Sequence, residues 1–530
     1  MFHCYLLPGR RLILILLALL MGVAGCVRPG PRPPELPEST RLETDAANDP
    51  EAAGAAATPD APLVVRLGTP VPDYSGLPTP DAPHYQLDPA TTQTSLGRHT
   101  VAAGETLGSI AQRYDTTVAA IVDMNDLTNP DVIAVGTQLQ VPGATIQQVI
   151  SPDFKIIPDS ELVYGPAASG FDALAFLEAA GGRVVGYSES VEGHMMTGPE
   201  IVQLIADRYS INPRLLLAVL EHQSGWVTQA SPPARPSLLG HADTGAASLY
   251  IQLGWAANLL NLGYYGRSEG GLRGFNLGES AQITFAPAIN DATAGVQRFL
   301  GAIDGATVES WQAAAGPDGL YATYNQLFGN PFAYTYEPIL PSGLAQPPLE
   351  LPWASGETWY FTGGPHGAWN TGSAWGALDF VPAAEQAGCV PTDAWVTAMA
   401  PGIVARSGNG AVVVDLDVGA NESDGYAGTL WAITYMHLET RDRAAAGTRV
   451  ATGDRLGHPS CEGGFSNGTH VHIVRSFNGR WISADGALPF EMGGWLSSGA
   501  GAEYDGYLKR GNVTKGACVC REDVNSITRP

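Results

Sequence analysis

Two histidines stand close together near the carboxyl end of the sequence, in the segment CEGGFSNGTHVH. They are His470 and His472, separated by one valine. Side chains two residues apart on a β-strand point to the same face of the sheet, so both imidazoles would lie at one place. Imidazole nitrogens bind metal ions and transfer protons near neutral pH. The spacing therefore predicts a metal site or a proton relay on one face of a strand.

Further polar residues lie upstream in the same region. TGGPHGAWNTGSAWGALDF holds His366 and Asp379, ITYMHL holds Tyr435 and His437, and GHPSCEGG holds Cys461. The short β-rich segments around them are punctuated by Gly and Asn, which is typical of an antiparallel β domain. A single histidine in such a domain usually has a structural role. Several motifs in this order within one domain indicate a shared site.

These motifs resemble those of the zinc peptidases of the lysostaphin and LytM superfamily. The long separation of the first histidine from the aspartate and the CEGG segment are most similar to the beta-lytic endopeptidases. The resemblance implies that Zn²⁺ is bound by His366, Asp379 and His472, with water in the fourth position. Three protein ligands and one open position are typical of a catalytic zinc site.

The same resemblance assigns His437 and His470 to catalysis rather than to metal binding. One would act as a base toward water, and the other would contact the oxyanion or the leaving amine. Tyr435 precedes His437 by two residues on the same face of the expected strand and is predicted to support it. We therefore expect an antiparallel all-β zinc metallopeptidase domain at residues 354–520.

Four cysteines follow the amino-terminal segment, and they are Cys389, Cys461, Cys518 and Cys520. In an oxidising compartment they are expected to form two disulfides. A bond between Cys518 and Cys520 would be strained, because a single residue separates them. We expect each of these two to bond to Cys389 or Cys461, in an order that the sequence leaves open.

The amino terminus has the features of an export signal. An arginine pair precedes an apolar run, and VAGC resembles the lipobox of bacterial lipoproteins, which implies lipid attachment at Cys26. Residues 1–25 would be the signal peptide. Residues 26–97 are rich in Pro and Ala and are predicted to form a disordered tether. We expect an exported protein anchored to a membrane, with an ordinary secretory signal or a transmembrane anchor as the alternative.

Residues 98–143 resemble a LysM module over their whole length. Two short strand-like segments flank two segments with apolar residues at helical spacing, so the expected order is strand, helix, helix, strand. The resemblance implies binding of N-acetylglucosamine-containing glycans such as peptidoglycan through two loops. The loop residues are Gly104, Glu105, Thr106, Asn129, Pro130 and Asp131.

A connector at 144–190 leads to a mainly helical region at 191–336, and a linker follows at 337–353. In the helical region, INPRLLLAVLEHQSGW looks like the active-site helix of lysozyme-like lytic transglycosylases, whose signature is Glu-Ser. Gln223 stands where the glutamate is needed, and an amide cannot donate the proton for glycosidic cleavage. Glu221 is displaced from that position by about 200° around the helix. We predict a degenerate transglycosylase-like domain that binds glycan, and an unrelated helical spacer is the alternative.

The composition argues against nucleic acid as a partner. Asp and Glu number 52 against 28 Lys and Arg, and the formal net charge is −24. Together the modules predict a multidomain α+β protein that is an exported, membrane-anchored peptidoglycan hydrolase. LysM would bind the glycan, and the zinc domain would cleave peptide cross-links or stems. The alternative is a non-catalytic peptidoglycan-binding regulator or activator of other hydrolases, which would be expected to lack metal ligands.

Overall fold

The computed structural model describes most of the chain beyond residue 96. The described residues are 97–102, 105–114, 116–127, 129, 133–141, 147–242, 247–269, 271–278, 281–383, 388–417 and 423–530. The predicted signal peptide, the lipidation site at Cys26 and the predicted tether up to residue 96 lie outside them. So do Gly104, Pro130 and Asp131, which are predicted to bind glycan. Within the described part, no helix combines the length and the apolar character that crossing a membrane requires.

The first domain is a small two-stranded, two-helix module. Its elements are β1 (Gly97–Thr100), α1 (Leu107–Arg113), α2 (Val118–Met124) and β2 (Gln138–Val141). Strands β1 and β2 pair in the antiparallel sense, and Thr106 and Thr117 cap the two helices. Leu107, Ile110 and Ile121 form its core with Leu139 and Val141 of β2. The order strand, helix, helix, strand agrees with the prediction.

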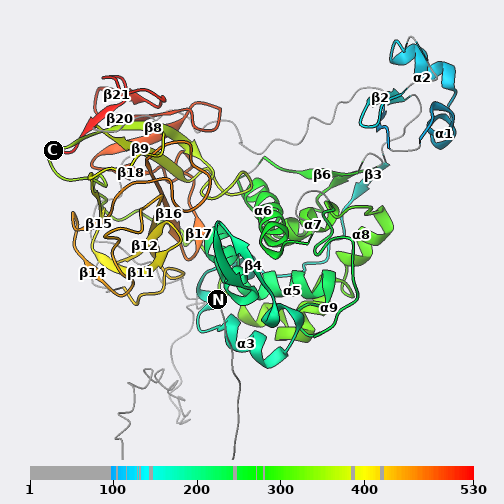
Figure 1. Ribbon diagram of the computed structural model, residues 1–530, viewed down its shortest axis with the longest axis horizontal. Coiled ribbons are helices and arrows are strands. Elements are labelled where there is room, and N and C mark those ends of the chain that lie inside the picture. The colour runs from blue at the N-terminus through cyan, green and yellow to red at the C-terminus, as the bar shows by residue number, and fades with distance from the viewer. Residues whose placement is uncertain are drawn as a thin grey trace, which may run out of the picture. The chain divides into compact units, whose positions relative to one another are not determined.

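The second domain is mainly helical, as Figure 1 shows. Its helices are α3 (Ala173–Ala180), α4 (Gly198–Tyr209), α5 (Pro213–Ser224), α6 (Leu249–Ser268), α7 (Asp291–Gly301), α8 (Val308–Ala314) and α9 (Leu320–Phe328). Its 3₁₀ helices are η1 (Asp159–Glu161), η2 (Pro166–Ala168), η3 (Arg183–Gly186) and η4 (Pro331–Tyr334). Its strands are β3 (Gln147–Ile150), β4 (Ser188–Val191), β5 (His194–Thr197), β6 (Gly274–Leu277) and β7 (Ala281–Thr284).

Helix α5 lies in the core of this domain. Asn212 caps it and Pro213 occupies its first turn, where a missing N–H costs nothing. Its first eight residues are all buried. The segment predicted as a connector also enters this core, because Ile156, Leu177 and Val184 are buried in it. The domain therefore begins well before residue 191.

The carboxyl-terminal domain is built from antiparallel strands. They are β8 (Thr358–His366), β9 (Ala377–Pro382), β10 (Val396–Thr397), β11 (Gly402–Gly408), β12 (Ala411–Leu416), β13 (Trp431–Met436), β14 (Arg449–Val450), β15 (Arg455–Gly457), β16 (Val471–Phe477), β17 (Arg480–Trp481), β18 (Glu491–Met492), β19 (Trp495–Gly499), β20 (Gly506–Arg510), β21 (Val513–Gly516) and β22 (Ser526–Thr528). The main sheet has the order β14-β11-β12-β13-β16-β9-β8-β22, and a second sheet has the order β18-β19-β20-β21.

Two predicted boundaries of this domain differ from the structure. Strand β22 pairs with β8, so the sheet continues beyond the predicted end at residue 520. The predicted linker also packs against the sheet, because Leu351 and Trp353 are buried and Trp353 stacks on Trp359 at 5.3 Å. The Pro-rich composition of this segment predicted a free linker. Burial of its apolar residues instead stabilises the packed conformation.

The helical and β domains share a buried interior. Ala368, Ala374 and Trp481 of the β domain belong to the same apolar cluster as the helix residues. The backbone N–H of Trp481 donates a hydrogen bond of 3.0 Å to the buried Tyr265 hydroxyl. These contacts have the character of a protein core rather than of a loose interface between domains.

Replacing Tyr265 by phenylalanine tests this shared interior. The variant removes the acceptor of the Trp481 N–H and leaves a buried donor without a partner. We expect the free energy of unfolding to fall by about 1–3 kcal/mol. Urea unfolding followed by tryptophan fluorescence measures it. Tyr507→Phe, at a tyrosine that is 46% exposed, is the matched control. Equal stability of Tyr265→Phe and the control would contradict the buried contact.

Candidate functional site

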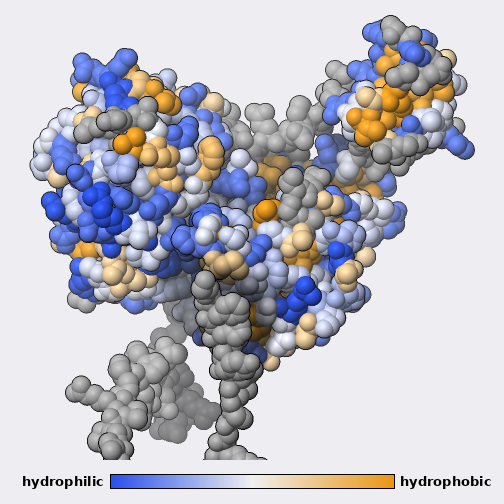
Figure 2. All heavy atoms as spheres, in the orientation of Figure 1, coloured by the Kyte–Doolittle hydropathy of each residue, from blue (hydrophilic) through white to orange (hydrophobic). Residues whose placement is uncertain are grey.

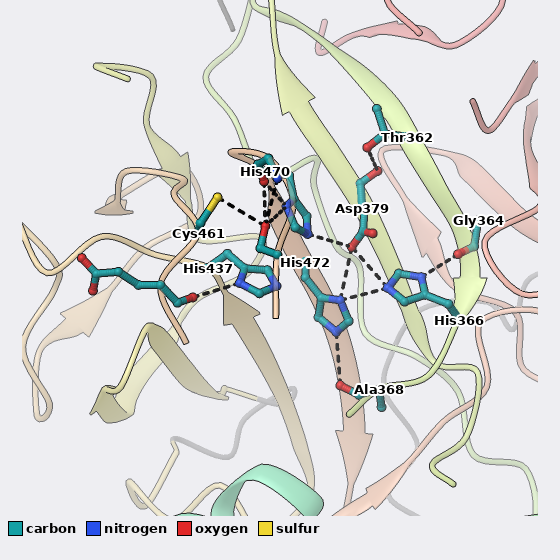
Figure 3. A network of polar contacts seen from close by, with 12 residues as sticks. Thr362, Gly364, His366, Ala368, Asp379, His437, Cys461, His470 and His472 are labelled. Carbon is teal, nitrogen blue, oxygen red and sulfur yellow. Dashed lines mark hydrogen bonds and ion pairs between the residues drawn. The ribbon is translucent and has the colours of Figure 1, made fainter. Parts of the chain in front are cut away.

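Five of the predicted site residues converge on one face of the main sheet, and Figure 3 shows them as His366, Asp379, His437, His470 and His472. They come from adjacent strands, because β16 lies between β13 and β9, and β9 pairs with β8. His472 is opposite Asp379 across β16 and β9 and opposite Met436 across β16 and β13. His366 ends β8 after two register irregularities in its pairing with β9. The fold thus assembles residues that lie far apart in the sequence.

Three side chains form a compact triad. The distances are 3.0 Å between His366 Nε2 and His472 Nδ1, 3.3 Å between His366 Nε2 and Asp379 Oδ1, and 3.2 Å between His472 Nδ1 and Asp379 Oδ1. Ligands at about 2.0–2.1 Å from a tetrahedral zinc ion are about 3.3 Å from one another. The three atoms therefore have the spacing that one such ion requires, and the triad is a group of residues that could hold a metal ion.

Hydrogen bonds fix which nitrogen of each triad histidine faces inward. His366 Nδ1–H donates to the Gly364 carbonyl at 2.8 Å, and His472 Nε2–H donates to the Ala368 carbonyl at 3.2 Å. Each imidazole then keeps a lone pair on the nitrogen that faces the triad. These backbone acceptors are the kind of outer contact that orients histidine ligands in metal sites.

Asp379 supplies a buried negative charge. Burial by itself would raise the pKa of this carboxyl, but the neighbouring imidazoles of His366 and His470 hold it well below its usual range. Among the residues that the structure describes, none donates a well-formed hydrogen bond to Asp379 Oδ1. A Cβ atom on Gly363 would lie only 2.6 Å from Asp379 Oδ2, so glycine makes room for the carboxylate. An ionised, unsatisfied oxygen beside two imidazoles fits a bound cation.

His437 and His470 lie beside the triad with their rings 4.4 Å apart. His437 Nδ1–H donates to the Glu462 carbonyl at 2.9 Å, and His470 Nδ1–H donates to the Gly468 carbonyl at 2.8 Å. Burial and the neighbouring imidazoles lower the pKa of His437 to about 3, so its ring is neutral at neutral pH. The neutral His437 ring thus keeps a lone pair on Nε2 that can accept a proton.

The predicted support of His437 by Tyr435 is wrong. Tyr435 is opposite Ile473 in the register and lies in the core below the sheet. Its hydroxyl accepts the backbone N–H of Met399 at 2.8 Å. His437 itself has a left-handed φ of 59°, which breaks the alternation of the strand after Met436. The two side chains therefore leave the strand on opposite faces.

The predicted cysteine pairing is also wrong. The structure joins Cys389 to Cys461 and Cys518 to Cys520. Residues 518–520 form a turn in which the Cys520 N–H donates to the Cys518 carbonyl at 2.7 Å. This turn places their Cα atoms 5.2 Å apart, which is within the range for a disulfide.

Two residues near the metal triad were not predicted from the sequence. The ring of Tyr504 stacks on His366 with a centroid distance of 4.2 Å, and burial raises the pKa of its hydroxyl to about 12. Glu503 Oε1 accepts the N–H of Gly367 at 3.1 Å. Both lie between β19 and β20, where no spacing pattern connects them with the histidine motifs. Tyr504 and Glu503 are recognised as site residues only from their contacts with His366 and Gly367 in the folded protein.

The described part of the predicted glycan loops has mainly local contacts. Glu105 Oε2 lies 2.7 Å from His99 Nε2 and accepts the N–H of Ala102 at 2.8 Å. Thr106 caps α1, and Asn129 is exposed. Glycan binding by these residues stays a prediction.

Glu221 and Gln223 lie in the last turn of α5. The Glu221 carboxylate accepts the N–H groups of Val227 and Thr228 at 2.9 and 3.0 Å, which satisfies backbone donors beyond the helix. This is a structural role for Glu221. The resemblance of the domain to transglycosylases, and its binding of glycan, stay predictions.

A cavity of about 1180 Å³ contains the triad and both further histidines. Residues of both larger domains line the cavity. The helical domain contributes Glu192, Tyr209 and Tyr250, and the β domain contributes the histidines and Asp379. The Arg208 guanidinium lies 4.7 Å from the centre of the Trp369 ring, which is also part of the lining. The site therefore opens into a space large enough for several residues of a peptide.

Two family models match the chain. The model described as LasA, N-terminal domain, matches residues 155–340, and the model described as LysM domain matches residues 99–142. Protease LasA of Pseudomonas aeruginosa is 27% identical over 369 residues, which are 66% of this chain and 78% of that protein. The LasA model covers helices α3 to α9, and the LysM model covers the first domain.

Solved structures with similarity to the chain include two peptidases. Pseudoalterin, described as a novel M23 metalloprotease from the deep sea, is 25% identical and covers 33% of this chain and 96% of its own, with a TM-score of 0.27. The catalytic domain of lysostaphin from Staphylococcus simulans is 23% identical and covers 24% of this chain and 89% of its own, with a TM-score of 0.17.

Proposed function

We propose that this chain, which is a homologue of protease LasA with a LysM domain, is a zinc metalloendopeptidase that cleaves the peptides of peptidoglycan. The observation that carries the proposal is the triad of His366, Asp379 and His472, whose facing atoms have the spacing of zinc ligands. A regulator without activity has no need of a complete ligand set. The triad therefore favours the enzyme over the non-catalytic alternative.

The proposed zinc ligands are His366 Nε2, Asp379 Oδ1 and His472 Nδ1. When bound, zinc lowers the pKa of water and polarises a carbonyl group, which is the chemistry of peptide hydrolysis. With two neutral imidazoles and one carboxylate as ligands, a bound Zn²⁺ would keep a net positive charge, and this charge would stabilise the negative charge that develops on the carbonyl oxygen of the substrate.

His437 and His470 handle protons in this proposal. Because the Nδ1–H group of each donates to a backbone carbonyl, each Nε2 is available to accept a proton from water. The protonated imidazole can then donate that proton to the leaving amine. The hydrogen bonds at Nδ1 fix the two rings, so both Nε2 atoms are already positioned beside the triad before a substrate binds.

The LysM domain supports peptidoglycan as the partner and the cell wall or periplasm as the location. A weak glycan contact on the same chain raises the effective concentration of the peptidase at its substrate. Lipidation at Cys26 would add attachment to a membrane, and we propose it on the resemblance of VAGC to a lipobox. The acidic composition argues against a nucleic acid partner.

Mass spectrometry of digested peptidoglycan tests the function. We expect the zinc-loaded protein to release fragments with new amino termini, because an amide bond is cleaved. Fragments that differ only by cleavage of glycosidic bonds would instead assign the activity to the helical domain. A zinc-loaded protein that releases neither kind of fragment would contradict the proposal.

A further inference from the structure

Trp369 contacts the helical domain and also lines the cavity of the β domain. It directly follows Ala368, whose carbonyl accepts the Nε2–H of His472 in the triad at 3.2 Å. Its ring is half-buried and forms part of the cavity lining. Its backbone N–H donates to the hydroxyl of the fully buried Ser373 at 2.9 Å. The tryptophan therefore belongs to a folded loop that begins beside the proposed metal ligands.

Arg208 of α4 fixes the Trp369 ring from the helical domain. The guanidinium carbon lies 4.7 Å from the centre of the ring, which is the distance of a cation–π contact. The Glu192 carboxylate accepts two hydrogen bonds from Arg208 at 2.7 and 2.8 Å, and the Tyr250 hydroxyl accepts one at 2.8 Å. Arg208 is buried and does not belong to the cavity lining. Its contact with Trp369 is therefore internal to the protein and does not involve substrate.

Two further contacts hold the same loop against the helical domain. Asn258 Oδ1 of α6 accepts the Gly372 N–H at 2.8 Å, and Asn370 Nδ2 donates to the Tyr209 hydroxyl at 3.3 Å. A Cβ atom on Gly372 would lie 2.0 Å from the Asn258 carbonyl oxygen, so only glycine allows this close approach. The position of the Trp369 ring is therefore set by contacts that the helical domain provides.

The outer edge of the Trp369 ring meets a second loop, which runs from Cys461 to Thr469. A Cβ atom on Gly464 would lie only 2.9 Å from Trp369 Cη2. The disulfide at Cys461 and the hydrogen bond donated by the Thr469 N–H fix the two ends of this loop. Its middle, GGFSNG, contains three glycines, which lose more conformational entropy on ordering than other residues do. The middle of the loop therefore needs support from its neighbours.

Phe465, next to Gly464 at the rim of the cavity, does not give this support. Its side chain is 93% exposed, so it gains little free energy by burial. On the part of the β domain that Figure 2 shows, hydrophilic residues predominate and hydrophobic ones form small patches. Support comes instead from close backbone approaches, with Gly463 against Gly410 and Gly464 against Trp369.

Backbone carbonyls of this second loop orient both histidines beside the triad. The Glu462 carbonyl accepts the Nδ1–H of His437 at 2.9 Å, and the Gly468 carbonyl accepts the Nδ1–H of His470 at 2.8 Å. Glu462 lies two residues before Gly464, and Gly468 lies four residues after it. A shift of the loop would therefore turn both imidazoles, and a misplacement of about 1 Å can cost about 10²-fold in rate.

We propose that Trp369 is a positioning residue, which keeps the loop from Cys461 to Thr469 in place and thereby orients His437 and His470. Arg208 of the helical domain acts through the Trp369 ring. The helical domain thus supports catalysis without contacting the reacting atoms. The inference rests on the proposed endopeptidase function, because the two oriented histidines are its proposed proton acceptors.

A double-mutant cycle tests the proposal, with full-length, zinc-loaded protein and a soluble peptidoglycan peptide that the wild type cleaves. We expect Trp369→Ala to lower kcat by about 10- to 100-fold and to change KM by less than about 3-fold. Arg208→Met should lower kcat by about 3- to 10-fold. In the Trp369→Ala background, Arg208→Met should add less than about a 2-fold change, because its effect passes through the ring. If Trp369→Ala does not fold, Trp369→Phe replaces it, since phenylalanine lacks the outer ring edge that meets Gly464.

Trp395→Ala and Arg455→Met are the matched controls. The Arg455 guanidinium carbon lies 4.6 Å from the centre of the Trp395 ring, which is half-buried and outside the cavity lining. We expect kcat to stay within about 2-fold of the wild type in both. Thermal unfolding and zinc content are measured for every variant.

Four results would overturn the inference while leaving the peptidase function intact. They are an unchanged kcat in Trp369→Ala, a rise in KM alone, a loss of zinc in parallel with kcat, and effects of the Trp369 and Arg208 changes that multiply in the double variant. A zinc-loaded wild type that releases no peptide fragments from peptidoglycan would instead contradict the proposed function, and the inference would fail with it.

Discussion

Asp379→Asn is expected to abolish peptide cleavage because the variant no longer binds zinc tightly. The change keeps the shape of the side chain and removes the only carboxylate of the triad formed with His366 and His472. We expect zinc affinity to fall by more than about 100-fold, since even outer-shell changes cost 10- to 100-fold. Activity at limiting zinc should fall below about 1% of the wild type for the same reason.

Two measurements separate the causes of this loss. Equilibrium dialysis with zinc gives the affinity directly, and the release of new amino groups from peptidoglycan gives the activity. Asp393→Asn is the matched control, because the Asp393 side chain is 95% exposed and pairs with Arg441. A variant at Asp379 that keeps full zinc affinity would show that this carboxylate is not a ligand.

His437→Asn is expected to lose activity while keeping zinc. Asparagine tolerates the left-handed φ of 59° at this position better than most residues, so the backbone should be preserved. An amide cannot accept and return a proton as the His437 imidazole does, and the loss of such a group typically costs about 10²- to 10⁴-fold in kcat. Steady-state kinetics on a peptide substrate, together with zinc content, measure both effects.

His194→Asn is the control for this change, since His194 is exposed on β5. We expect it to leave zinc content and kcat unchanged. If His437→Asn lost zinc in parallel with activity, His437 would belong with the ligands. A kcat equal to that of the wild type would remove His437 from the proton transfer.

The sequence indicated much of the site because its chemistry depends on residue types and on short spacing. The spacing of His470 and His472 predicted that they share a face. In the structure His472 lies on β16, His470 directly precedes this strand, and both lie beside Asp379. The resemblance to the zinc peptidases implied which histidines form the triad with Asp379. In the LysM domain, strand-like segments and apolar residues at helical spacing were enough to give the order of the elements, which the structure has as β1, α1, α2 and β2.

Residue types and short spacing did not predict local backbone conformations or contacts between segments that are distant in the sequence. Tyr435 was misplaced because the left-handed conformation of His437 ends the alternation on which the argument depended. Tyr504 reaches His366 only because the segment between β19 and β20 lies beside the end of β8. The disulfide between Cys518 and Cys520 depends on a local turn that residue spacing does not specify.

The sequence by itself therefore determined the LysM module and the residue types that meet in the triad, since both are written in local patterns. Tertiary structure alone decided how they combine. It placed Glu192 and Tyr250 of the helical domain in the wall of the cavity, and it held Phe465 exposed at the rim. The physical reason is that burial and strand pairing join segments far apart in the chain, and spacing along a sequence carries no record of which segments meet.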